Sequence, residues 1–375
     1  MSMPTTGGLP VAWRVPLLVL GMLSLLTGVA AGLLRAGWGV PLPDPALAAD
    51  HGPLMAAAFF GTVIGLERAV AHGRLWAFLS PLLAGAGGLL LIGGAPAPAA
   101  LSSLAGGGAL LTLATLAAAR RQPALHTRVL VLASALAAVA PLVWLADART
   151  AATAGWAGFL VLTIAGERLE LSRFLPPSPA ARRVFVAIVG LLLLGVAASW
   201  AGDGGLRPFG AGLVALALWL LRQDVARRTV RQRGLTRFIA VCLLSGYFWL
   251  FVGGALLVVQ PPLVLLMDAA LHAVFVGFVL AMVFGHAPII FPAIVRVNLP
   301  YRPRFYLPLL VLHASLLLRV GGDLAGDVQL RAWGAAGNAL CIALFVLTMA
   351  AAAVAGRRAG AGGSPDDAGP AAGRR

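Results

Sequence analysis

An aspartate and two histidines interrupt a long apolar stretch at residues 263–292, and such side chains can bind protons or metal ions. Asp268 and His272 stand four positions apart, which places them on one face of a helix. A carboxylate in that position can hold and orient an imidazole ring. His286 follows His272 by fourteen positions, which at about 100° per residue predicts nearly the same face. Because ionisable groups are costly in a membrane, the pattern indicates a buried polar site.

The elements that would position these residues are membrane-spanning helices. Hydrophobic residues make up 60% of the chain and charged residues 11%, and apolar segments of roughly 20 residues recur with short loops. We therefore predict an all-α, polytopic integral membrane bundle of about twelve transmembrane helices, formed by residues 1–356. The tail, 357–375, is predicted to be disordered. The predicted spans are 14–35, 52–71, 76–94, 97–119, 127–146, 151–172, 183–201, 207–222, 237–259, 263–286, 304–320 and 332–355.

The arginines predict the orientation of this bundle. All 28 basic residues are arginine, and 23 of them fall in the termini and the even-numbered loops. Basic loops remain in the cytoplasm, so both termini are expected inside, in a bacterial inner membrane. The net charge of +15 then indicates contact with the lipid bilayer and no nucleic-acid partner. The outer loops hold the remaining arginines and, among other acids, Asp323; these arginines are Arg35, Arg149, Arg207, Arg319 and Arg331.

Three histidines on three predicted helices then fall in the outer half of the membrane. They are His51, His272 and His313. Neutral imidazole is the commonest ligand of haem iron and copper, and Met55, one turn after His51, offers a thioether. We predict that these residues hold a haem, with copper as a further candidate, and that Asp268 orients His272. The alternative is that each histidine only closes a polar gap between helices.

A second feature is the segment from His286 to Pro292. Pro288 and Pro292 each lack a backbone donor, so the helix is expected to kink or end there. His286 would then cap the helix end, or act as a second ligand or proton-transfer group on the cytoplasmic side.

Two Glu-Arg pairs, Glu67-Arg68 and Glu167-Arg168, end apolar runs on the predicted cytoplasmic side. Their similarity hints at an internal repeat, a common feature of transporters. In the simplest interpretation each arginine extends to the interface and each glutamate pairs with it. The alternative gives the glutamates a proton-conducting or substrate-facing role.

The late histidine motif resembles a known family. His272-Ala-Val-Phe-Val-Gly277, followed by Met282 and by Gly285-His286, is similar to the late-helix motif of the NnrS family. That family comprises bacterial membrane proteins of about twelve helices that contain haem and copper and are associated with the response to nitric oxide. The resemblance implies a haem protein with nitric oxide as a small gaseous ligand.

The early motif, His51-Gly-Pro-Leu-Met55, is also similar to that family's histidine–methionine motif. By this likeness His51, His272 and His286 would be cofactor ligands. The chain departs from the pattern at Pro53, where a second histidine is expected, and at Glu67-Arg68.

The sequence thus leads to one main prediction and two alternatives. The main prediction is a membrane-embedded haem or haem–copper protein acting in nitric oxide or redox stress. The first alternative is a proton-coupled transporter, with Asp268 and His272 as the coupling pair and Glu67 and Glu167 as gates. In the second, the polar residues only fix helix packing. No soluble catalytic motif is present, so no enzyme class is predicted.

Overall fold

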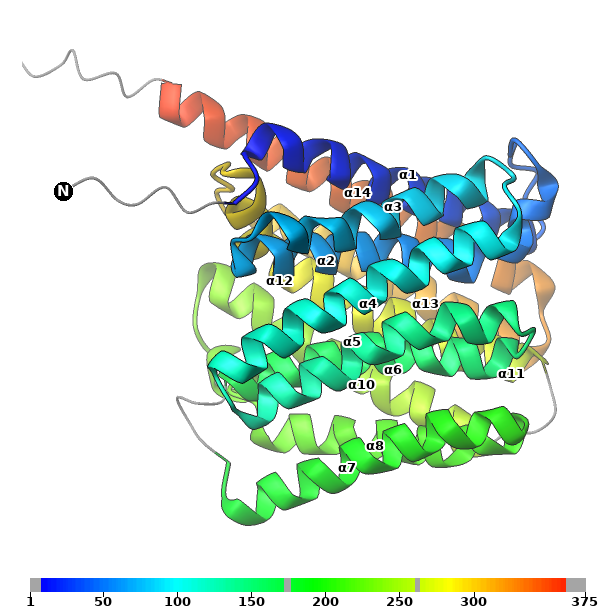
Figure 1. The fold of residues 1–375 in the computed structure, drawn as a ribbon. Coiled ribbons are helices and arrows are strands. Elements are labelled where there is room, and N and C mark those ends of the chain that lie inside the picture. The colour runs from blue at the N-terminus through cyan, green and yellow to red at the C-terminus, as the bar shows by residue number, and fades with distance from the viewer. Residues whose placement is uncertain (1–7, 172–176, 260–263, 362–375) are drawn as a thin grey trace, which may run out of the picture.

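The computed structural model of the 375-residue chain describes residues 8–171, 177–259 and 264–361. These residues form a bundle of helices without a β-strand in the described ranges (Figure 1). Ten of the helices described are long and apolar enough to cross a membrane. The prediction of an all-α bundle of apolar helices is therefore confirmed at this level. The number of spans and their orientation stay predictions.

The first half of the chain folds into consecutive helices in which α3, α4, α5 and α6 pack against their sequence neighbours. The elements are α1 (Val11–Arg35), η1 (Pro45–Asp50), η2 (Pro53–Phe59), α2 (Phe60–His72), η3 (Leu75–Phe78), α3 (Leu79–Ile92), α4 (Ala97–Arg121), α5 (Leu125–Leu145) and α6 (Arg149–Leu171).

The second half adds α7 to α14 and returns the chain to α1, against which α14 packs. The elements are α7 (Pro179–Ala198), η5 (Ser199–Ala201), η6 (Asp203–Gly205), α8 (Leu206–Gln223), α9 (Ala226–Thr229), α10 (Gly234–Val259), α11 (Val264–His272), η7 (Ala273–Leu280), α12 (Ala281–Val295), η8 (Pro303–Phe305), α13 (Tyr306–Ala325) and α14 (Val328–Ala361). The N-terminal end of α1 and the C-terminal end of α14 lie at the same end of the bundle (Figure 1).

Helix α6 lies at the centre of the bundle. Most of its residues are buried, and the core around it combines Phe159, Leu160 and Leu162 with residues of neighbouring helices. Small residues allow close helix packing. A Cβ atom on Gly108 of α4, for example, would stand 2.5 Å from the backbone nitrogen of Ala138 in α5. Helices α6 and α8 account for two of the predicted spans but are not among the ten apolar helices above.

Two segments of the bundle are π-helical, a rare winding that is frequently found at functional sites. The first, η2, begins two residues after His51, and the second, η7, begins directly after His272. Because η7 separates His272 from His286, the assumption of one continuous α-helix between them was wrong. The two histidines do not open on the same cavity, as described below.

The last predicted helix boundaries also require correction. Helix α12 does not end at His286; it continues through Pro288 and Pro292 to Val295, where Arg296 takes a left-handed conformation with φ 53°. Helix α14 includes residues 357–361, which were assigned to the tail. Residues 362–375 lie outside the described residues.

Candidate functional site

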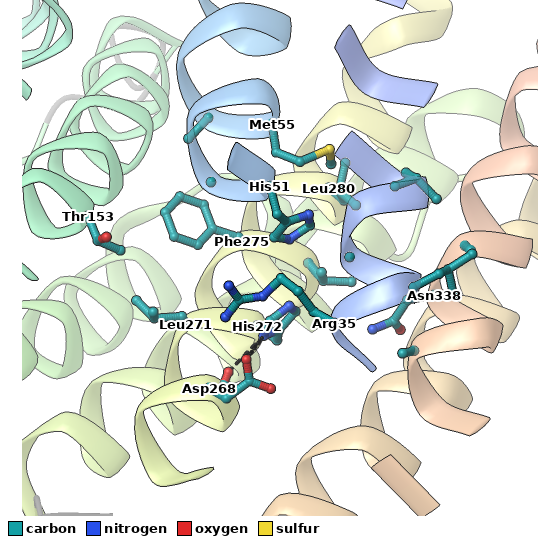
Figure 2. Close-up of a pocket in the computed structure, with 18 of the residues that line it drawn as sticks. Arg35, His51, Met55, Thr153, Asp268, Leu271, His272, Phe275, Leu280 and Asn338 are labelled. Atoms are coloured by element: carbon teal, nitrogen blue, oxygen red, sulfur yellow. Dashed lines mark hydrogen bonds and ion pairs between the residues drawn. The ribbon is translucent and has the colours of Figure 1, made fainter. Parts of the chain in front are cut away.

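A cavity of about 220 Å³ lies between α1, η2, α6, α11, η7 and α14. Apolar side chains cover most of its wall, among them Phe60, Trp144, Trp156, Phe275 and Leu280. Polar groups interrupt this wall, and Figure 2 labels all of them except Arg319. They are Arg35, His51, Thr153, Asp268, His272, Arg319 and Asn338.

His51 and His272 face each other in this cavity although 221 positions separate them in the chain (Figure 2). Their ring centres are 6.3 Å apart and their planes differ by 13°. Nδ1 of His51 lies 2.7 Å from the carbonyl oxygen of Gly28, and Nδ1 of His272 lies 2.8 Å from that of Asp268. A carbonyl oxygen only accepts, so in neutral rings each Nδ1 carries the hydrogen and each Nε2 keeps a free lone pair. An imidazole in this tautomer can bind a metal through Nε2.

Helix α1 shapes the site by lacking side chains at Gly28 and Gly32. A Cβ atom on Gly28 would stand 2.8 Å from Sδ of Met55, and one on Gly32 would stand 2.8 Å from Cε1 of His51. These contacts are shorter than real Cβ contacts allow, so a larger residue at either position would force the side chain of Met55 or His51 to move. Met55 lines the cavity with His51, as their spacing in the sequence predicted.

Gly32→Ala is expected to destabilise the protein by about 1–3 kcal/mol, because the new methyl group must displace the His51 ring. Thermal unfolding of the purified protein, followed by tryptophan fluorescence, measures this change. Gly190→Ala in α7 is the matched control, since a Cβ atom there has no neighbour within 4 Å. Equal stability of the two variants would show that α1 does not constrain His51.

An ion-pair cluster closes one end of the cavity. The Asp268 carboxylate accepts a hydrogen bond from Arg319 at 2.8 Å and lies 3.4 Å from Nδ1 of His272. Arg331 lies 3.7 Å from Asp268 and 3.3 Å from the carboxylate of Asp323. The predicted proximity of Asp268 to His272 is therefore confirmed, and Asp268 also holds a buried guanidinium.

The sequence analysis missed the arginines of this cluster because it placed Arg319 and Asp323 in an outer loop. Both belong to α13, where Arg319 is 6% and Asp323 3% exposed, and Arg331 belongs to α14. The spacing of Arg319 and Asp323, four positions apart after an apolar run, is a signal of two charges on one helix face.

Two further predicted ligands lie outside the cavity. His313 of α13 accepts a hydrogen bond at Nδ1 from the indole nitrogen of Trp249, 3.0 Å away, and its Nε2 is buried without a partner. Nδ1 of His286 lies 2.6 Å from the carbonyl oxygen of Met282. The structure thus brings together His51 and His272, and does not place His313 or His286 with them.

The two Glu-Arg motifs pair differently from the simple expectation. Arg68 of α2 donates to Glu167 of α6, and Arg168 lies 3.4 Å from Asp224. The prediction that each glutamate pairs with the neighbouring arginine was therefore wrong, because helices α2 and α6 present these residues to other partners. Neither Glu67 nor Glu167 lines the cavity.

Asp224 is the centre of a second buried polar group. Its carboxylate accepts hydrogen bonds from the Tyr247 hydroxyl at 2.8 Å and from the backbone N–H of Ala226 at 2.7 Å. Both Asp224 and Arg168 are buried. Sequence reasoning missed this group because Asp224 stands in an arginine-rich segment that was interpreted as a topological anchor.

The fold and the cavity define a helical protein with multi-pass membrane character and a histidine-lined site between its helices. Residues 14–354 match the family described as Domain of unknown function (DUF8744), and the chain belongs to that family. No curated protein and no solved structure matches the chain. The description of the family carries no activity, so the function has to be argued from the site.

Proposed function

We propose that the protein binds haem in this cavity, where His51 and His272 would hold it. The observation that carries the proposal is the pair of facing imidazoles, each with a free Nε2. A metal held about 2 Å from one nitrogen of each ring, on opposite sides, would put the ring centres about 6 Å apart. The observed separation is 6.3 Å with nearly parallel rings.

The ligand set favours haem over a protein-bound ion. Within the described residues, no group of three His, Cys, Asp or Glu side chains is placed to hold a metal. Two imidazoles alone are a poor site for most metal ions, whereas a porphyrin supplies four nitrogens itself and needs only axial protein ligands. Met55 provides a thioether beside His51, which makes copper(I) the second candidate.

The cavity wall also suits a flat apolar ligand with acidic substituents. Phe60, Trp156 and Phe275 can pack against such a ligand, and the exposed Arg35 can pair with a carboxylate. A haem is larger than the cavity, so lining side chains must move when it binds. Arg35 is the natural one to move, since it reaches into the site from the end of α1 (Figure 2) and has no ion pair within the described residues.

The proposed setting is a bacterial inner membrane, with twelve spans and both termini in the cytoplasm. The arginine distribution supports this orientation, as does the position of the N-terminal end of α1 and the C-terminal end of α14 at one end of the bundle. The similarity of the two histidine motifs to the NnrS family supports a role in nitric oxide or redox stress, with nitric oxide as the gaseous ligand. Haem would supply iron redox chemistry or gas binding there.

The absorption spectrum of the purified protein, recorded with and without dithionite, tests the proposal together with iron and copper analysis. We expect a Soret band that is lost in His51→Ala and in His272→Ala. His313→Ala is the matched control, because that histidine is also buried in the bundle but lies outside the cavity. A protein without chromophore after expression with added haem, or a full Soret band in His272→Ala that folds normally, would refute the proposal.

A proton-coupled transporter is the second candidate, and the ion-pair cluster of Asp268, His272 and Arg319 is the observation that favours it. Asp268→Asn separates the two functions in protein that still folds. A transporter should lose the pH dependence of transport. A haem protein should keep its cofactor, with a shifted spectrum, because Asp268 only supports the ligand His272.

A further inference from the structure

A second cavity, of about 280 Å³, lies at the end of the bundle where α2, α4 and α6 end and α5 begins. This end carries the N-terminal end of α1 and the C-terminal end of α14 in Figure 1, so in the proposed orientation it faces the cytoplasm. Its polar lining residues include Arg68, His72, Arg121, Gln122, His126 and Glu170. No residue of the histidine-lined cavity lines this one.

The charged residues described around this second cavity differ in their ion pairs. Arg68 is bonded to Glu167 and also lies within electrostatic range of Glu170. Arg121, by contrast, has no ion pair within the described residues and is exposed to solvent. The first turn of α5 also opens on the cavity through His126 and Thr127, and a helix N-terminus carries partial positive charge.

His72 adds an unused hydrogen-bonding group. Both of its ring nitrogens are buried, and neither has a hydrogen-bond partner in the described structure. Its ring packs edge-on against Trp76, with the ring centres 5.0 Å apart. Buried polar atoms are seldom left unpaired, so a ligand in the cavity would satisfy a group that the protein itself does not.

We propose that this cavity binds a phosphate group. Arginine offers a planar fork of donors that matches phosphate oxygens, and His72, Gln122 and the start of α5 add donors from other directions. Glu170, the carboxylate in the wall, opposes anion binding and sets its strength. The phosphate can belong to an anionic lipid of the cytoplasmic leaflet or to a soluble compound, since both present the same oxygens.

Calorimetric titration of the purified full chain with inorganic phosphate tests the site. Arg121→Gln is expected to weaken binding about tenfold or more, the effect of losing one charge-assisted pair. Arg120→Gln is the matched control, because Arg120 is the exposed neighbour that does not line the cavity. Glu170→Gln is expected to tighten binding, since it removes the opposing charge.

A second arm identifies the source of the phosphate. The protein and both arginine variants are placed in nanodiscs of phosphatidylcholine, with and without phosphatidylglycerol, and bound lipid is counted by native mass spectrometry. A lipid site retains phosphatidylglycerol in the parent protein and in Arg120→Gln but not in Arg121→Gln. A soluble-phosphate site binds inorganic phosphate in phosphatidylcholine nanodiscs with the same ranking. If neither ligand distinguishes Arg121→Gln from Arg120→Gln, the proposal is wrong.

Discussion

Asp268→Asn is expected to lower the free energy of unfolding by about 3–5 kcal/mol, the usual cost of leaving a buried ionic partner unpaired. The reason is Arg319, whose guanidinium donates to Asp268 at 2.8 Å and is buried in α13. Without the carboxylate, Arg319 keeps its charge in an apolar environment. Thermal unfolding in detergent, followed by tryptophan fluorescence, measures the loss.

Asp147→Asn is the matched control for this variant. Asp147 also pairs with an arginine, Arg149, at 2.9 Å, but both side chains are largely exposed, and such pairs contribute roughly 0–1 kcal/mol. The double variant Asp268→Asn/Arg319→Met should recover most of the lost stability, because it removes the unpaired charge as well. If Asp268→Asn melts like Asp147→Asn, Arg319 does not depend on Asp268.

Asp224→Ala is expected to lower the free energy of unfolding by a comparable amount, about 3–5 kcal/mol, because it leaves the buried Arg168 without its ionic partner. The same change removes the acceptor of the Tyr247 hydroxyl and the cap of the Ala226 N–H group. Tyr247→Phe, which removes only one hydrogen bond, should cost about 1 kcal/mol. Melting curves of the variants, recorded in the same detergent, rank these effects.

Asp44→Ala isolates the contribution of capping. Asp44 accepts from the N–H of Ala46, two residues on, just as Asp224 does from Ala226, but its bond is exposed. Loss of such a cap costs about 1 kcal/mol. An Asp224→Ala variant no less stable than Asp44→Ala would contradict a role of Asp224 in holding Arg168.

Local chemistry could be predicted from the sequence, and helix rotation could not. The apolar runs and the spacing of Asp268 and His272 follow from hydropathy and from the four-residue period of a helix. The depth of His313 was estimated on the same basis, but depth does not specify which way a helix face points. His313 lies on a face of α13 that packs against Trp249, and it does not line the cavity.

The partners of the charged residues depend on which helices become neighbours. Arg68 meets Glu167 because α2 and α6 approach each other, a fact that no local pattern contains. The π-helical turns after His51 and His272 could not be predicted either, because the periodicity of the sequence was interpreted with the geometry of a regular α-helix.

The hydrogen bonds that orient His51 and His272 have a consequence for how the site can change. Both rings are held by main-chain oxygens, those of Gly28 and Asp268, so no side-chain substitution can delete either acceptor. Replacing Asp268 removes its charge but leaves its carbonyl in place. A mutational scan of the cavity would therefore detect the two histidines and the two glycines of α1, Gly28 and Gly32. It would not detect the main-chain oxygens that fix the tautomer of each histidine.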